Sequence, residues 1–163
     1  MPPVPGGDSR LSSVPEVVHA TCVALGRRAA LLRGPPGSGK SDLALRFLFL
    51  ARRGPAALEP PALVADDQVI LHRDGDRVMA RAAEHITGQM EVRGVGIIGV
   101  KPVAEAEVVL VVDLVEPAAV ERMPVRDVKA RVAGIELPLL KLSPFEASAP
   151  IKLALELARA GRS

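Results

Sequence analysis

The chain has 163 residues, 48% of them hydrophobic and 25% charged, and a formal net charge of +2. This length suits one domain with a sizeable apolar core, and it leaves little room for a second domain. Aromatic residues make up only 2%, and Lys and Arg are spread along the chain, so the composition argues against nucleic acid as a partner. No apolar run approaches the ~20 residues that span a bilayer, and none opens the chain as a secretion signal would. We therefore expect no membrane insertion and a cytoplasmic location.

The first part of the chain predicts a tail followed by a β-hairpin. Residues 1–13 are rich in Pro, Gly and Ser and are expected to form a flexible tail, with one catalytic domain over 14–163. Two apolar runs, 17–25 and 29–33, lie on either side of a Gly-containing turn and predict paired strands. The single cysteine, Cys22, lies in the first run, so a buried structural thiol is its expected role.

Residues 34–41 carry the P-loop pattern G-x-x-x-x-G-K-S between an apolar strand and a helical pattern. The glycines permit a tight loop whose backbone N–H groups converge on phosphate oxygens, at the positive end of the following helix. Lys40 is expected to reach the β- and γ-phosphates, and Ser41 to bind the Mg²⁺ that bridges them. A glycine-rich turn without a ligand is the competing interpretation. The predicted phosphate-binding residues are Gly34, Pro35, Pro36, Gly37, Ser38, Gly39, Lys40 and Ser41.

The rest of the chain predicts further strands around a second helix. The first helix is expected to end near Arg53, with Gly54 as its cap, before a proline-rich loop. Apolar runs predict strands over 62–65, 69–72, 77–82, 108–112 and 135–142, and a helix over 148–160. Three glycines in the segment 90–99 suggest that something approaches its backbone closely. We therefore expect an α/β fold with a mixed β-sheet, a P-loop and flanking helices.

Two acidic residues, Asp66 and Asp67, follow the predicted strand 62–65. Successive residues of an extended chain point to opposite faces. One carboxylate could thus serve the metal or the scaffold, and the other could accept the proton of an attacking hydroxyl. A turn-forming Asp pair is the structural alternative.

Three other side chains are candidates with structural alternatives. Glu91 and Arg93 would share a face if extended, one suited to Mg²⁺ and the other to phosphate, or they could form an ordinary ion pair. His19 precedes the P-loop strand, where a lone histidine is more often a core residue than a proton relay.

Four segments together resemble the catalytic domain of HPr kinase/phosphorylase, a bacterial enzyme that phosphorylates a serine of the phosphocarrier protein HPr. They are Val18-His19-Ala20-Thr21, the P-loop 34–41, Leu63-Val64-Ala65-Asp66-Asp67 and Glu91-Val92-Arg93-Gly94-Val95-Gly96-Ile97-Ile98. The resemblance covers about residues 14–142 and implies a fold similar to that of phosphoenolpyruvate carboxykinase.

By this resemblance Lys40 binds phosphates, and Ser41 and Glu91 hold Mg²⁺. Asp67 becomes the base of the kinase reaction and the acid of its reverse. The resemblance also makes His19 a catalytic histidine, in place of the core role that the residues alone favour.

The resemblance further implies that Arg122 acts on the transferred phosphoryl group in both directions. Asp66 and Arg93 are expected at the bound nucleotide. The implied cofactors are ATP and Mg²⁺, and the implied partner is HPr or a related phosphocarrier. The family is commonly hexameric, which makes a homo-oligomer an expectation here.

The resemblance has departures that shape the functional hypothesis. We expect a short form without the separate N-terminal domain of longer members. The segment 139–144 departs from the family's later motif associated with phosphorolysis, so serine kinase activity is the leading hypothesis and the reverse reaction an addition to it. The alternatives are a catalytically silent nucleotide-binding sensor and a small-molecule P-loop kinase.

Overall fold

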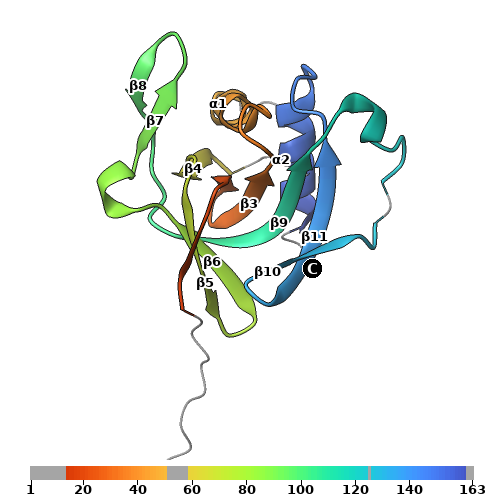
Figure 1. The fold of residues 1–163 in the computed structure, drawn as a ribbon, viewed down its shortest axis with the longest axis horizontal. Helices are drawn as coiled ribbons and strands as arrows, with labels where there is room; N and C mark the ends of the chain where they lie inside the picture. Colours follow the sequence, from red (N-terminus) through yellow and green to blue (C-terminus); the bar gives the residue numbers. More distant parts are fainter. Residues whose placement is uncertain (1–13, 51–58, 125, 161–163) are drawn as a thin grey trace, which may run out of the picture.

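The computed structural model describes residues 14–50, 59–124 and 126–160. These residues form a curled mixed sheet with two helices against one face, and a small separate hairpin (Figure 1). The α-helices are α1 (Lys40–Leu48) and α2 (Ala149–Ala160), and the 3-10 turns are η1 (Glu84–Ile86) and η2 (Pro117–Ala119). The strands are β1 (Glu16–Val18), β2 (Thr21–Leu25), β3 (Arg28–Arg33), β4 (Pro61–Ala65), β5 (Val69–Asp74), β6 (Arg77–Arg81), β7 (Gln89–Val92), β8 (Gly96–Gly99), β9 (Ala106–Leu114), β10 (Lys129–Val132) and β11 (Ile135–Leu142).

The order of strands in the main sheet decides which segments meet at one edge. The order is β1-β5-β6-β9-β3-β2-β4, and β11 joins through β9 and carries β10. Strand β3 runs parallel to β9, and β9 runs parallel to β11, whereas β2 is antiparallel to both β3 and β4. The ends of β3, β4, β9 and β11 therefore lie at the same edge as the start of β2. This sheet confirms the predicted mixed α/β fold.

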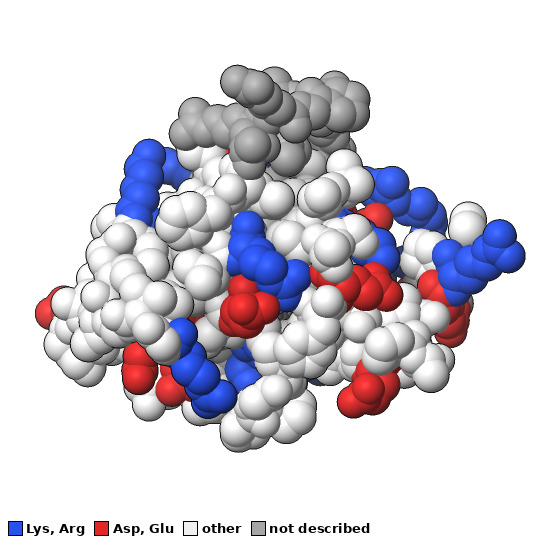
Figure 2. Space-filling view, turned by 90° about the horizontal axis from the view of Figure 1, so that it is seen from above, with Lys and Arg blue, Asp and Glu red and all other residues white. Residues whose placement is uncertain are grey.

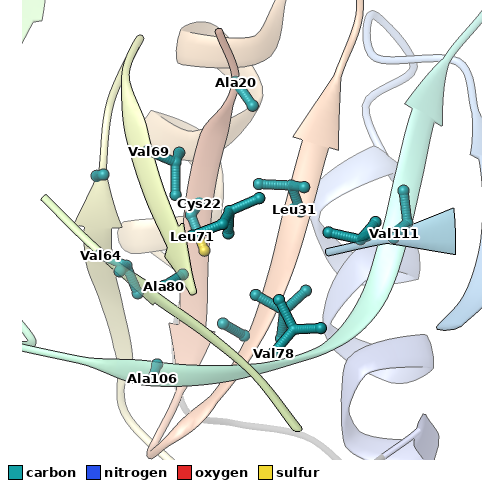
Figure 3. Packing of buried hydrophobic residues seen from close by; sticks show 14 of the residues in the cluster. Ala20, Cys22, Leu31, Val64, Val69, Leu71, Val78, Ala80, Ala106 and Val111 are labelled. Atoms are coloured by element: carbon teal, nitrogen blue, oxygen red, sulfur yellow. The ribbon is translucent and has the colours of Figure 1, made fainter. Parts of the chain in front are cut away.

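Two apolar layers hold the central strands in place. Within β2, Cys22 belongs to a cluster on one face of the sheet and Val23 to a cluster on the other, which also contains Phe47 of α1 and Leu153 of α2. Figure 3 shows the first cluster, where side chains of β5 and β6 close over β2 and β3. Because successive side chains of a strand alternate between faces, burial on both faces explains why these strands read as unbroken apolar runs.

The predicted hairpin and the last strand are confirmed, and other boundaries differ. Strands β2 and β3 pair antiparallel, and β11 covers the predicted range 135–142. The first apolar run is interrupted at His19 and Ala20, between β1 and β2. The prediction that the first helix ends near Arg53 was wrong, because α1 ends at Leu48, where the N–H of Phe49 caps it. The predicted cap Gly54 and the tail 1–13 lie outside the described residues.

The strands β7 and β8 were not predicted. Two of the three glycines in this hairpin are explained by its turn, whereas a close approach to the backbone was expected. Among the described residues, no atom outside the neighbouring residues lies within 4 Å of a Cβ built on Gly94, Gly96 or Gly99, so no described segment of this chain approaches this backbone closely. Gly94 and Gly96 have φ of 85° and 108°. A hairpin turn with left-handed backbone is where glycine is favoured.

On the face shown in Figure 2, side chains of both charge signs are interspersed. Neither described helix has the length and apolar character needed to cross a membrane.

Candidate phosphate-binding and phosphotransfer site

The P-loop connects the end of β3 to the start of α1 and is held in shape by its own lysine. Lys40 is 7% exposed, and its Nζ donates hydrogen bonds to the carbonyl oxygens of Gly34 (2.7 Å) and Pro35 (3.1 Å). Gly37 and Gly39 have φ of 79° and 95°, a left-handed backbone that residues with a Cβ rarely adopt. Lys40 thus closes the loop on its own carbonyl oxygens, and its expected contact with the β- and γ-phosphates stays a prediction.

A buried hydroxyl inside the loop has no partner among the described residues. Ser38 Oγ is fully buried without a hydrogen bond, and a Cβ built on Gly34 would lie 2.4 Å from it. A buried polar atom without a partner costs free energy of about 1–3 kcal/mol, unless a bound group satisfies it. A phosphate oxygen is an acceptor that would do so.

Asp66 joins the loop to the central sheet. Its Oδ1 accepts hydrogen bonds from Ser41 Oγ (2.8 Å) and from Thr21 Oγ1 (3.0 Å). Because the Ser41 hydroxyl donates a hydrogen bond to Asp66, the lone pairs of Ser41 Oγ are left for a cation. Mg²⁺ prefers a few protein oxygens together with water and phosphate oxygens, so Ser41 and Asp66 fit this ion.

Asp67 turns away from Asp66 toward a histidine. His19 Nε2 lies 3.1 Å from Asp67 Oδ1, and the side chains are 55% and 69% exposed. The two acids do not diverge by extended-chain alternation as predicted, because Asp67 has φ of 68° and the N–H of Gln68 donates to Asp66 O. Left-handed backbone is tolerated by aspartate but remains costly, and such geometry concentrates at functional sites.

The remaining predicted residues are not joined to this group by a described contact. Glu91 is exposed on β7, and Arg93 lies past the end of β7 in the hairpin turn, so the two do not share a strand face. Arg122 is exposed between η2 and β10. Among the described residues no cluster of three or more His, Cys, Asp or Glu side chains could hold a metal. The metal role of Glu91 and the phosphate roles of Arg93 and Arg122 stay predictions.

Sequence reasoning missed two contributors to this edge of the sheet. Thr21 supplies the buried hydroxyl on Asp66, and Arg33 forms a bidentate pair with Asp113 at 2.8 and 3.1 Å. The pair joins register neighbours of the parallel strands β3 and β9, immediately before the loop. Opposite charges at the ends of two predicted strands were the available signal, but the pairing of those strands was not predicted.

The loop, its buried lysine and the hydroxyl-carboxylate contact are typical of P-loop domains, a class of proteins in which this loop holds phosphate groups. Comparison with protein families is more specific. The chain belongs to the family described as the HPr Serine kinase C-terminal domain, whose model matches residues 11–159.

Similar proteins and a solved structure agree with this family. The chain is 31% identical to the HPr kinase/phosphorylase of Chlorobium phaeobacteroides strain BS1, over 89% of this chain and 43% of that protein. It is 29% identical to the enzyme of the same name from Lactobacillus acidophilus, over 86% of this chain and 44% of that protein. The chain thus spans less than half the length of these curated relatives. The structure of the Hpr(Ser) kinase/phosphatase from Coxiella burnetii shares the fold, with a TM-score of 0.69, 24% identity, and coverage of 90% of this chain and 96% of that one.

Proposed function

We propose that this chain is an ATP- and Mg²⁺-dependent protein kinase domain that phosphorylates a serine of HPr or a closely related phosphocarrier. The observation that carries the proposal is the position of the His19–Asp67 pair next to the residue that joins the P-loop to the sheet. Family membership supports HPr as the substrate, and the names of the relatives support the kinase reaction. Such a carrier would meet the enzyme in the cytoplasm.

The chain's own residues divide the work of phosphoryl transfer. Lys40 and the loop N–H groups bind the phosphates of ATP and place the γ-phosphorus. Asp67 accepts the proton of the serine hydroxyl while the serine oxygen forms its bond to phosphorus and the bond to the β-phosphate oxygen breaks, leaving ADP. His19 holds the Asp67 carboxylate through the contact of its Nε2 with Asp67 Oδ1 at 3.1 Å. Mg²⁺, bound at Ser41 and Asp66, would offset the charge of the phosphates.

Arg122 and Glu91 complete the proposal. Arg122 would stabilise the negative charge of the transferred group through its fork of N–H donors. Glu91 would join Ser41 in holding the metal. Both side chains are exposed in the described structure, so their participation requires approach to the P-loop on binding of nucleotide and protein.

The test is incubation of the purified chain with ATP, Mg²⁺ and HPr from the same organism, followed by mass spectrometry of HPr. We expect one phosphoserine with the wild-type chain, none with Lys40→Ala, and a strong loss with Asp67→Asn. Absence of phosphoserine with wild type, while ATP still binds, would support the nucleotide sensor instead. Transfer to a metabolite and not to HPr would support the small-molecule kinase. Light scattering on the same sample measures whether the chain forms the hexamer common in the family.

A further inference from the structure

An exposed aromatic ring lies beside the P-loop. Phe145 is 71% exposed, although it is one of only three phenylalanines in the chain. A Cβ built on Gly39, the last residue of the loop before α1, would lie 3.1 Å from the Phe145 ring atoms Cε1 and Cζ. One edge of the ring therefore contacts the loop, while most of its surface faces solvent.

The turn that carries this ring is fastened to α1. Arg46 donates hydrogen bonds to the carbonyl oxygens of Pro144 and Glu146, one on each side of Phe145. Lys152 Nζ of α2 forms an ion pair with Glu146 Oε2 at 2.6 Å. Pro144 is buried, which leaves the turn little freedom to shift. The backbone that carries the ring is thus held in position before any ligand binds, which lowers the entropic cost of binding.

The strand order places Phe145 and the acidic pair on opposite sides of the loop. From β3, which leads into the P-loop, the sheet continues through β2 to β4 and thus to Asp66 and Asp67. In the other direction it continues through β9 to β11, whose end leads to Phe145. The carboxyl ends of β4 and β11 lie at the same edge of the sheet, and α1 lies between them (Figure 1).

We propose that Phe145 is the stacking surface for the purine base of the bound nucleotide. The inference rests on the proposed function, which directs the γ-phosphate toward Asp67 and so leaves the sugar and base to extend toward the other flank. A phenyl ring has no hydrogen-bonding group, so it recognises a base through its π face. Placing a base on the ring also removes exposed apolar surface from water.

The chain offers a matched control for this role. Phe49 is 75% exposed, much as Phe145 is, and it lies at the opposite end of α1 from the P-loop. Each substitution to alanine removes one exposed phenyl ring. Only the one at position 145 removes a ring beside the phosphate site.

The experiment is calorimetric titration of the wild-type chain, Phe145→Ala, Phe49→Ala and Phe145→Trp with Mg²⁺ and either ATP or inorganic tripolyphosphate. Stacking of a base contributes about 1–3 kcal/mol, so Phe145→Ala should weaken ATP binding by about tenfold. Tripolyphosphate affinity should stay within about twofold, since that ligand has no base. Phe49→Ala should change neither affinity, and Phe145→Trp should retain ATP binding.

Three outcomes would overturn the inference. One is unchanged ATP affinity in Phe145→Ala, and another is an equal loss for ATP and tripolyphosphate, which would mean that the ring only supports the loop. The third is a wild-type chain that binds ATP no tighter than tripolyphosphate. Because these are binding measurements without HPr, a chain that stacks ATP on Phe145 yet never phosphorylates a protein would separate failure of the proposed function from failure of this inference.

Discussion

His19 Nε2 and Asp67 Oδ1 lie 3.1 Å apart, although more than half of each side chain is exposed to solvent. An exposed pair of this kind contributes only about 0–1 kcal/mol to stability. The left-handed backbone of Asp67, with φ of 68°, opposes folding by an amount of the same order or larger. Stability therefore does not explain the arrangement, which agrees with the proposed role of Asp67 as a proton acceptor.

The first prediction concerns Asp67→Asn. The amide keeps the shape of the side chain but cannot serve as a base, so phosphotransfer to HPr should fall by about 10²–10⁴-fold. The free energy of unfolding, measured by urea denaturation, should change by less than about 1 kcal/mol. Asp76→Asn is the matched control, because Asp76 is an exposed carboxylate in the turn between β5 and β6. Equal activity in both variants would remove Asp67 from the mechanism.

The second prediction concerns the carboxylate next to it, Asp66. Asp66→Ala leaves the fully buried hydroxyl of Thr21 without its acceptor, so the free energy of unfolding should fall by about 1–3 kcal/mol. Combining it with Thr21→Val removes both partners, and the double variant should lose less than the sum of the two single losses. Urea denaturation of all four proteins measures this coupling. Strict additivity would mean that the contact contributes nothing.

These two aspartates also illustrate what the sequence could predict. The P-loop could be predicted because it consists of eight adjacent residues. The glycines, lysine and serine of this motif indicate its backbone geometry directly. The contact of Ser41 with Asp66, and of Asp66 with Thr21, joins residues 25 and 45 positions apart. It depends on the order of β2, β3 and β4, which apolar periodicity does not determine.

The hairpin of β7 and β8 shows a second limit. Its side chains are largely exposed, so the apolar alternation that marks a half-buried strand is weak there. Strand β10 does alternate between exposed and buried residues, but it has only four residues. Three glycines in the hairpin were interpreted as a close approach, whereas Gly94 and Gly96 serve the turn. A glycine in a sequence can indicate either a positive φ or a close neighbour, and only the three-dimensional structure distinguishes the two.

The third prediction concerns the single cysteine. Cys22 is fully buried, and this burial raises the pKa of its thiol well above the ordinary value of about 8.5. The native chain should therefore resist alkylation by iodoacetamide at pH 8, whereas the urea-unfolded chain should gain one adduct, as mass spectrometry would detect. Rapid labelling of the native chain would contradict the burial.

The raised pKa of the Cys22 thiol also makes the free energy of unfolding depend on pH. Above about pH 8.5 the unfolded thiol loses its proton while the folded thiol keeps it, so the unfolded state binds fewer protons. The contribution of Cys22 to the free energy of unfolding is thus complete below that pH and falls as pH rises further. Cys22→Ala should reduce this fall, as measured by urea denaturation between pH 7.5 and 10.

The last prediction uses two glycines of the P-loop that differ in what surrounds them. Gly37 and Gly39 both have left-handed φ, so replacing either with alanine should cost about 1–2 kcal/mol of unfolding free energy. A Cβ on Gly37 would meet no atom of the described residues beyond its chain neighbours within 4 Å, whereas one on Gly39 would lie 3.1 Å from the ring of Phe145. Gly39→Ala should therefore cost about 1–3 kcal/mol more than Gly37→Ala, as expected for overpacking.

Adding Phe145→Ala to Gly39→Ala should recover part of that additional loss, because the ring that the new methyl group meets is then gone. Recovery would be incomplete, since Pro144 Cβ would still lie 3.2 Å from the new methyl group. Urea denaturation of the two single glycine variants and of the double variant measures both effects. Equal losses in Gly37→Ala and Gly39→Ala would mean that the Phe145 ring moves aside freely. A ring that moves aside freely would not be the fixed surface that stacking on a base requires.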